Sequence, residues 1–343
     1  MEKSIQKPVQ KPINSGFNAY TESIDVIRDI NLSGKTAVVT GGYSGLGRVA
    51  ANLLSEAGAR VIVPARDFAR AAQALAFNKK IEVHEMDLQD SGSIDRFADD
   101  LLKSIGQLDI LINCAGIMAT PQKRDSRGFE SQFSTNHLGH FQLTARLWPA
   151  LKRASGSRIV SVTSWGHRFS DMDYDDWNFG KKAYDPWVAY GQSKTANSLF
   201  AVAVDAHGVE NGIRAFAVHP GTILDTNLSQ YVPAATLMEF GVLDHEGNPV
   251  HDPSRNLKTE SQGAATILWC ATNPVLDGLG GLYAENCDIA GIGEAKDSWG
   301  VSDSFYMNGV MPYAVDAANA GRLWKLSEKL TGVGLDNQLP HTF

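Results

Sequence analysis

The chain has 343 residues, of which 43% are hydrophobic and 20% charged, an ordinary balance for a soluble globular enzyme. Its formal net charge of −7, without any stretch dense in Lys or Arg, argues against nucleic acid or an anionic membrane surface as the main partner. No segment reaches the roughly 18–20 apolar residues that span a bilayer, and residues 1–33 lack an apolar run of signal-peptide length. We therefore expect a cytoplasmic protein without a membrane anchor.

The order of elements predicts the fold. Residues 1–33 are polar and interrupted by Pro8 and Pro12, so we expect an N-terminal arm with one short amphipathic segment at 23–30. From residue 35 onward, apolar strand-like runs alternate with helical periodicity. We predict strands at 36–40, 60–64, 81–86, 108–113, 158–163 and 213–218, and helices at 47–57, 69–76, 91–105, 129–154 and 190–207. This alternation predicts a single α/β domain over 34–290, built as a Rossmann-type, doubly wound, mostly parallel sheet.

Three segments depart from this rhythm. Residues 165–187 are rich in aromatic and acidic residues, and residues 222–262 carry several prolines and little periodicity. Long connections of this kind often cover a binding site, so we expect both to lie over the substrate. The aromatics would then favour an apolar or aromatic substrate, although Trp177 and Trp187 could equally serve to pack the segment onto the body. Residues 291–343 form a C-terminal extension with a predicted helix at 315–330.

A glycine-rich turn joins the first strand to the first helix, with the sequence TGGYSGLG at 40–47. Glycines permit a tight turn and a close backbone approach to a pyrophosphate, and the N-terminus of a helix offers free N–H groups. A plain tight turn is the alternative reading, but the position in the first βαβ unit favours dinucleotide binding. The predicted cofactor-binding residues here are Gly41, Tyr43, Ser44, Gly45 and Leu46.

The residues after the second strand discriminate between NADP and NAD. An acid at the end of this strand would accept hydrogen bonds from a ribose 2′-OH, whereas Arg66 can bind a 2′-phosphate. Arg48, at the start of the first helix, offers a second cation. We therefore predict that NADP(H) is preferred over NAD(H). The alternative is that Asp67 pairs with Arg66 and binds the ribose itself.

The ends of the third and fourth strands lie at the same edge of the predicted sheet. Asp87 and Leu88 follow the third strand, and the sequence NCAG at 113–116 follows the fourth. We expect Asp87, Leu88, Asn113, Ala115 and Gly116 to contact the cofactor, although each could be a plain turn at a strand end.

A tyrosine and a lysine four residues apart share one face of the predicted helix 190–207. The phenol of Tyr190 has an ordinary pKa near 10, and a nearby ammonium such as that of Lys194 would stabilise its phenolate. Ser164, at the end of the fifth strand, can polarise a substrate oxygen beside this tyrosine. His167 is a further candidate acid or base, but a lone polar residue beside a site more often positions a loop.

These motifs together resemble the short-chain dehydrogenase/reductase family. The resemblance covers about residues 34–290 and rests on TGGYSGLG at 40–47, NCAG at 113–116, Asn136, Ser164, YGQSK at 190–194 and Pro220-Gly221. The sequences STNHLGHF at 134–141 and YGQSKTAN at 190–197 are most similar to the retinol-dehydrogenase-like branch.

The resemblance implies a role for each matched residue. Tyr190 would be the general acid/base, Ser164 would orient the substrate oxygen, Lys194 would bind the nicotinamide ribose, and Asn136 would hold a water in a proton relay. Residues that follow the sixth strand would cover the nicotinamide carboxamide, namely Pro220, Gly221, Ile223 and Thr226. Asp225 stands where the family has a threonine, and Thr226 follows it, so the carboxamide contact differs from the family pattern.

The sequence thus predicts an NADP(H)-dependent oxidoreductase that interconverts a small-molecule carbonyl and an alcohol. A nucleotide-binding regulatory protein without turnover and an epimerase or dehydratase on the same fold are the alternatives. The His, Asp, Glu and Cys residues have no metal-ligand spacing, so we expect no metal, and the three cysteines are predicted to be free thiols. The family resemblance favours a homo-oligomer, but the segment 291–343 could cover an association surface.

Overall fold

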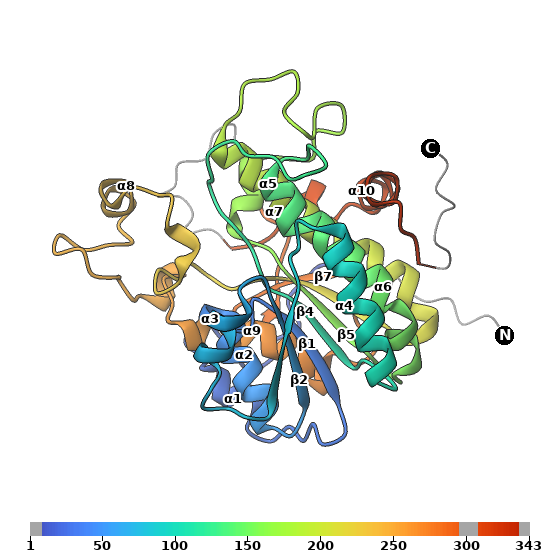
Figure 1. Cartoon of the computed structure of the whole chain (residues 1–343). Coiled ribbons are helices and arrows are strands. Elements are labelled where there is room, and N and C mark those ends of the chain that lie inside the picture. Colours follow the sequence, from blue (N-terminus) through green and yellow to red (C-terminus); the bar gives the residue numbers. More distant parts are fainter. Residues whose placement is uncertain (1–8, 295–307, 336–343) are drawn as a thin grey trace.

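One eight-stranded sheet forms the centre of the protein (Figure 1). The computed structural model describes residues 9–294 and 308–335. The strands are β1 Thr36–Thr40, β2 Arg60–Ala65, β3 Ile81–Glu85, β4 Ile110–Asn113, β5 Arg158–Val162, β6 Arg214–His219, β7 Leu282–Glu285 and β8 Asp288–Ile289. Their order is β3-β2-β1-β4-β5-β6-β7-β8, and only β8 runs antiparallel to its neighbour. The predicted Rossmann-type, mostly parallel sheet is confirmed, with its switch point between β1 and β4.

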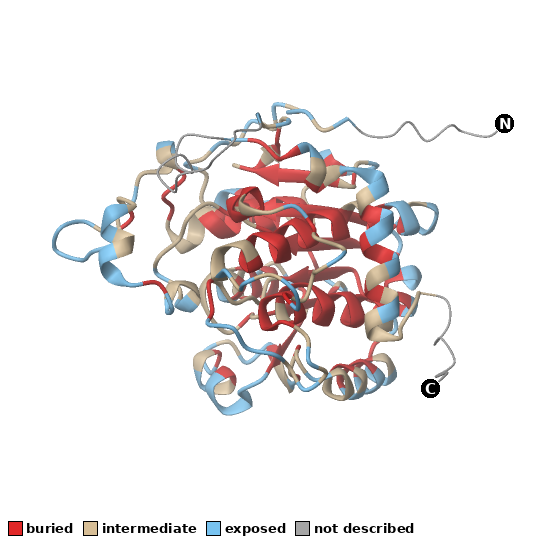
Figure 2. Ribbon diagram, turned by 90° about the horizontal axis from the view of Figure 1, so that it is seen from above, coloured by how far each residue is buried: buried red, intermediate tan, exposed pale blue. Residues whose placement is uncertain are grey.

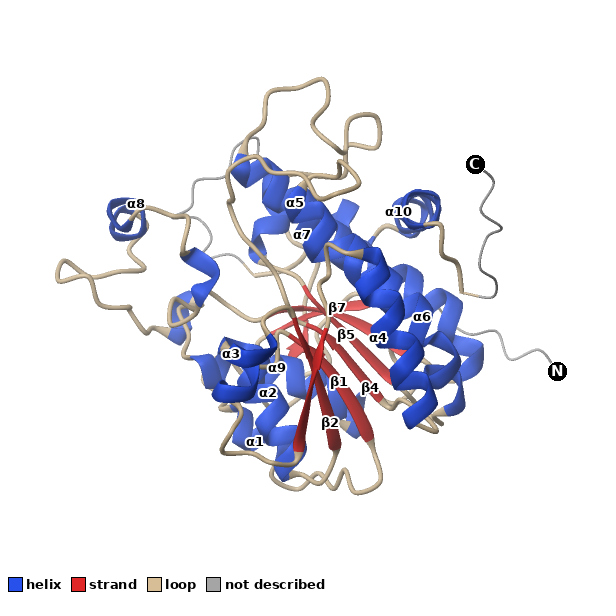
Figure 3. Cartoon of the chain, viewed as in Figure 1, coloured by secondary structure: helices blue, strands red, loops and turns tan. Residues whose placement is uncertain are grey.

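Helices cover both faces of the sheet, and the buried residues concentrate in the strands and in the helix faces that pack on them (Figures 2 and 3). One core cluster joins the sheet to α4, α6, α7 and α10, and a second joins it to α1, α2 and α9. The helices are α1 Ser23–Ile27, α2 Gly45–Glu56, α3 Phe68–Ala74, α4 Ser91–Ser104, α5 Ser131–Phe133, α6 Gly139–Arg153, α7 Pro186–Gly208, α8 Ala234–Glu239, α9 Glu260–Thr272 and α10 Ala317–Thr331. None of the helices in the described part of the chain is long and apolar enough to cross a membrane.

Two helices differ from the predicted ones for identifiable reasons. Helix α7 begins at Pro186 instead of residue 190, because the Asp185 carboxylate caps it by accepting from the N–H groups of Trp187 and Val188, and proline is well suited to the first turn. The helix predicted at 129–154 is divided into α5, a π-helical turn Ser134–Leu138, and α6. Single π turns often mark functional sites.

The described N-terminal segment packs on β7, and α10 packs on α7. The Gln10 side chain accepts from the Tyr283 N–H and donates to the carbonyl oxygens of Tyr283 and Ala290, so the N-terminal segment extends the hydrogen bonding of β7. On the neighbouring face α10 packs against α7, where the Trp324 ring stacks on Phe200 with an interplanar angle of 6°.

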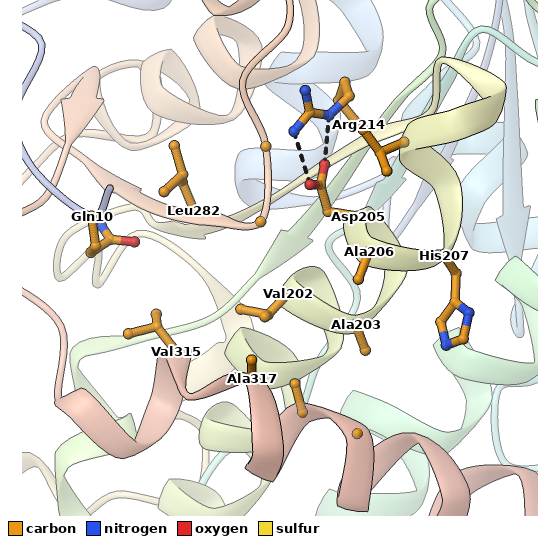
Figure 4. Close-up of a pocket in the computed structure, with 15 residues that line it drawn as sticks. Gln10, Val202, Ala203, Asp205, Ala206, His207, Arg214, Leu282, Val315 and Ala317 are labelled. Atoms are coloured by element: carbon orange, nitrogen blue, oxygen red, sulfur yellow. Dashed lines mark hydrogen bonds and ion pairs between the residues drawn. The ribbon is translucent and has the colours of Figure 1, made fainter. Parts of the chain in front are cut away.

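A buried ion pair lies beside a cavity of about 350 Å³ between α7, the start of β7 and α10 (Figure 4). The Arg214 guanidinium donates to both carboxylate oxygens of Asp205, at 2.8 and 2.9 Å, and each side chain is at most 10% exposed. Asp205 also accepts from the Ala215 N–H at 3.1 Å. The pair therefore connects the C-terminal end of α7 to the first residue of β6.

We predict that Asp205→Ala destabilises the fold by about 3–5 kcal/mol, because it leaves the Arg214 charge buried without its counter-ion. The matched control is Asp25→Ala, since Asp25 pairs with Arg28 on the surface, with both side chains more than 40% exposed; its cost should be about 0–1 kcal/mol. Denaturant unfolding of both variants measures the difference. Equal losses of unfolding free energy would show that the buried pair contributes no more than a surface one.

Candidate active site

A cavity of about 360 Å³ lies at the carboxyl ends of the central strands. Its wall combines the glycine-rich turn after β1, residues 114–117 after β4, the end of β5, residues of α7 and the segment after β6. The predicted site residues that line it are Gly41, Tyr43, Ser44, Gly45, Leu46, Arg66, Ala115, Gly116, Ser164, Tyr190, Lys194, Pro220, Gly221, Ile223 and Thr226. Parallel strands bring these distant segments to one edge.

The glycine-rich turn is too tightly packed for side chains. A Cβ on Gly47 would lie 2.5 Å from the Gly41 carbonyl oxygen, and one on Gly42 would lie 2.7 Å from the Val63 side chain. Gly45 begins α2 with a φ of +50°, a left-handed conformation that L side chains rarely adopt. The first turn of this twelve-residue helix lines the cavity. A bare backbone at a helix N-terminus fits a diphosphate.

A buried hydrogen-bond network joins this turn to the π-helical turn. Thr40 Oγ1 accepts from the N–H groups of Cys114 and Ala115 at 2.9 and 3.1 Å, and lies 2.8 Å from His140 Nε2. His140 Nδ1 lies 2.9 Å from the Asn136 carbonyl oxygen, which can only accept, so Nδ1 carries the proton and Nε2 accepts from Thr40. Burial lowers the pKa of His140 to about 4, which keeps it neutral.

Asn136 is fully buried beside the cavity and does not line it. Its side chain accepts from the Ile117 N–H and donates to the Ile117 carbonyl, both at 2.9 Å, and also donates to Ser193 Oγ at 2.9 Å. A Cβ on Gly116 would lie 3.2 Å from Asn136 Oδ1 and 3.5 Å from Lys194 Nζ. Asn136 thus links the segment after β4 to α7, close to the lysine.

Ser164, Tyr190 and Lys194 meet at the cavity wall. The Gly166 N–H donates to Ser164 Oγ at 3.0 Å, and the Ser164 hydroxyl is close enough to the Tyr190 phenol to favour its ionised form. Lys194 Nζ lies 5.7 Å from the centre of the Tyr190 ring and donates to the Val162 carbonyl at 3.1 Å. The sequence spacing of four residues on α7 places the phenol and the ammonium beside each other.

Burial dominates the electrostatics of these two groups. Burial raises the pKa of Tyr190 to about 12, and the hydrogen bond from Ser164 opposes that shift. Burial also lowers the pKa of Lys194 to about 8. Near neutral pH the phenol of the ligand-free chain therefore holds its proton.

The cations at the far end of the cavity differ from the predicted pair. Arg66 and Arg70 line the cavity, whereas Arg48 lies outside its lining and pairs with Glu260 at 3.4 Å. Asp67 caps α3 by accepting from the Arg70 N–H at 3.0 Å, and no ion pair with Arg66 is found among the described residues. Arg70 was not predicted from the sequence, although its position four residues after Arg66 could have indicated a second cation at this end of the cavity.

Three other predicted cofactor residues lie at strand ends without lining the cavity. Asp87 accepts from the Gln89 N–H in a local turn, and Leu88 is buried. Asn113 is also buried; its amide donates to Thr144 Oγ1 at 3.3 Å, and its Oδ1 has no hydrogen-bond partner within the described residues. These three residues support the cavity edge in this structure, whereas Cys114, which was not predicted, lines it.

The two predicted covering segments behave differently. In the segment after β6, Thr226 packs on the glycine-rich turn, with its Cγ2 2.9 Å from where a Cβ on Gly45 would lie, while Asp225 faces His251 at 3.6 Å. No residue of 165–187 lines the cavity. Trp177 instead packs on Phe133, with ring centres 5.4 Å apart, so its contacts correspond to the packing alternative.

His167 has both ring nitrogens engaged inside the protein. Nδ1 lies 2.7 Å from the Ser164 carbonyl oxygen, and Nε2 accepts from the Met311 N–H at 3.1 Å. Burial lowers the pKa of His167 to about 3. The residue is therefore placed to hold a turn and does not line the cavity. Within the described residues, no three His, Cys, Asp or Glu side chains gather where they could hold a metal ion.

Comparisons with known proteins agree with this geometry. The family model for short chain dehydrogenases matches residues 35–236. A probable oxidoreductase of Streptomyces lividans is 39% identical over 311 residues, which cover 89% of this chain and 100% of the relative. Retinol dehydrogenase 11 of Mus musculus is 35% identical, over 76% of this chain and 81% of that relative.

A crystal structure of a protein from Mycobacterium Paratuberculosis superimposes with a TM-score of 0.68 and 33% identity, covering 90% of this chain and 97% of that one. The resemblance to the retinol-dehydrogenase-like branch is confirmed by the similarity to retinol dehydrogenases 11, 12 and 14. Since the family model covers more than half of the chain and relatives match over most of their length, this protein belongs to the short-chain dehydrogenase/reductase family of oxidoreductases.

Proposed function

We propose that the protein is an NADP(H)-dependent oxidoreductase that interconverts a carbonyl and an alcohol, with Tyr190 as the general acid/base. The observation that carries this proposal is that Ser164, Tyr190 and Lys194 line the same cavity as the glycine-rich turn. A proton donor, a hydrogen-bond donor and a cation therefore stand beside a backbone cradle suited to a dinucleotide.

The chain's own residues supply the proton chemistry. When bound, the nicotinamide supplies the hydride in reduction and accepts it in oxidation. In the reductive direction Tyr190 donates its proton to the carbonyl oxygen, and Ser164 donates a second hydrogen bond that holds this oxygen in place. In the oxidative direction the phenolate takes the hydroxyl proton back.

The positive charge of Lys194 stabilises the phenolate of Tyr190. The raised pKa of Tyr190 opposes its ionisation, so a nearby positive charge is needed. Lys194 provides this charge in its protonated form and binds the nicotinamide ribose in the proposed complex. Asn136, locked between Ile117 and Ser193, fixes the segment around the lysine and holds the water of the proposed proton relay.

Arg66 and Arg70 are the proposed ligands of the 2′-phosphate. Both are exposed and both line the cavity; Arg66 lies between β2 and the N-cap of α3, and Arg70 lies in the first turn of that helix. Guanidinium groups bind phosphate through paired N–H donors. For the substrate we propose an apolar aldehyde, ketone or secondary alcohol, in line with the retinol dehydrogenases among the relatives.

We expect Arg66→Ala and Arg70→Ala each to weaken NADPH binding by about 10- to 100-fold, because each removes charge-assisted hydrogen bonds to the phosphate. NADH binding should change little, since NADH lacks this phosphate. Arg48→Ala is the matched control and should leave both affinities nearly unchanged. Fluorescence titration of the bound reduced cofactor gives the dissociation constants, and equal losses for NADPH and NADH would refute the phosphate role.

Tyr190→Phe should lower kcat by about 100- to 10,000-fold through the loss of the proton donor, while the dissociation constant of NADPH stays the same. The assay follows the absorbance of NADPH with a panel of apolar aldehydes and ketones, and of NADP⁺ with the alcohols. Retained turnover in the phenylalanine variant would contradict the assigned role. Conversion of substrate by the wild type without net change in NADPH would favour the epimerase or dehydratase alternative.

A further inference from the structure

The C-terminal extension contacts the turn that carries Ser164. We call residues 308–315 the C-terminal strap. Its Met311 N–H donates to His167 Nε2 at 3.1 Å, and its Tyr313 hydroxyl donates to the His167 carbonyl at 2.9 Å. Arg168 donates to the Gly309 carbonyl at 2.6 Å and to the Asn308 carbonyl at 3.1 Å. His167 and Arg168, three and four residues after Ser164, are thus bound to a segment about 140 residues away in the sequence.

The strap is itself fixed to the sheet. Its Val310 N–H donates to the Gly291 carbonyl at 3.0 Å, and the Gly293 N–H donates back to the Val310 carbonyl at 2.8 Å. The Gly309 N–H donates to the carboxyl of Glu285, the last residue of β7, at 2.6 Å. The strap is therefore hydrogen-bonded both to the turn after Ser164 and to the end of β7.

His167 transmits this support to Ser164. Its Nδ1 lies 2.7 Å from the Ser164 carbonyl oxygen, which can only accept, so Nδ1 is the protonated nitrogen. Nε2 is then unprotonated, and its lone pair accepts the hydrogen bond from the Met311 N–H. Only the neutral imidazole with this tautomer satisfies both bonds, and complete burial favours the neutral form.

Movement of this turn would disturb the reacting groups directly. The Gly166 N–H donates to Ser164 Oγ, and the His167 N–H donates to the Ser164 carbonyl at 3.1 Å. Gly166 also packs against the phenol ring, since a Cβ at this position would lie 2.6 Å from Tyr190 Cε1. The turn thus orients the Ser164 hydroxyl and packs against one side of the Tyr190 ring.

We propose that the C-terminal strap is a positioning element of the active site and that His167 is the positioning residue through which the Met311 N–H fixes Ser164. The catalytic consequence rests on the function proposed above for Ser164. The structural consequence, a turn held by the strap, does not depend on it. Misplacement of a reacting group by about 1 Å can lower the rate by up to about 100-fold, so a single backbone donor can affect turnover.

A proline at Met311 removes the N–H from which His167 accepts and puts a ring methylene in its place. Met311 has a φ of −67° and a ψ of 139°, which are within the backbone range of proline. Met311→Pro removes both the thioether and the N–H, whereas Met311→Ala removes the thioether and keeps the N–H. We expect kcat of Met311→Pro to fall about tenfold below that of Met311→Ala, with an unchanged dissociation constant for NADPH. Equal kcat values in the two variants would overturn the catalytic part of the proposal.

Hydrogen exchange tests the positioning without any substrate. In Met311→Pro the backbone N–H groups of Gly166 and His167 should exchange roughly tenfold faster than in Met311→Ala, because the turn loses its anchor. Peptides from α2 and α4, far from the strap, serve as the internal control and should exchange alike in both variants. Unchanged exchange at the turn would refute the strap's role. If the turn exchanges faster in Met311→Pro while kcat equals that of Met311→Ala, only the link to catalysis is refuted. If the wild type is inactive on every substrate, that result counts against the proposed function alone.

Discussion

The burial of a phenol and an ammonium on one face of α7 is the constraint on which the site depends. Neither group ionises freely in this position, since burial raises the pKa of Tyr190 to about 12 and lowers that of Lys194 to about 8. Burial also removes water that would compete for their hydrogen bonds. The ammonium is stabilised by the Val162 carbonyl, and Ser164 favours the phenolate form of Tyr190 against the effect of burial. A change in local charge can therefore shift the protonation of this pair strongly.

The rest of the fold holds this pair in place through buried hydrogen bonds. On one side, Thr40, His140 and Asn136 connect the glycine-rich turn to the π-helical turn and from there to Ser193 on α7. On the same helical turn, His137 Nε2 lies 2.7 Å from Ser327 Oγ of α10. Burial lowers the pKa of both histidines and keeps them neutral, but only His140 uses both ring nitrogens; Nδ1 of His137 has no hydrogen-bond partner among the described residues.

Much of the fold could be predicted from the sequence because its signals are local. Six strands have runs of apolar residues long enough to recognise, and the first five of these runs each precede a helical pattern. The strands β7 and β8 were missed, since they have four and two residues and lie among glycines. The division of the helix at 129–154 was also missed, because the π turn has only five residues, too few to change the hydrophobic pattern recognisably.

The site was predictable where a motif combines spacing and chemistry, as for Tyr190 and Lys194. It was not predictable where the fold creates the contact. The partner of His140 is Thr40, 100 residues earlier, and the partner of His167 is Met311, 144 residues later, and neither pairing leaves a pattern in the sequence. For Arg48 the sequence position suggested a cofactor contact, but in the fold its guanidinium pairs with Glu260 on α9.

The titration of Tyr190 tests the central claim most directly. NMR of the protein with ¹³C-labelled tyrosine, assigned with Tyr190→Phe, would report its ionisation in the free protein and with NADP⁺ bound. We expect the pKa of Tyr190 to lie well above 10 in the free protein, to fall when NADP⁺ is bound, and to fall less in Lys194→Met. An ordinary pKa in the free protein, or one that neither NADP⁺ nor the lysine substitution changes, would contradict the account.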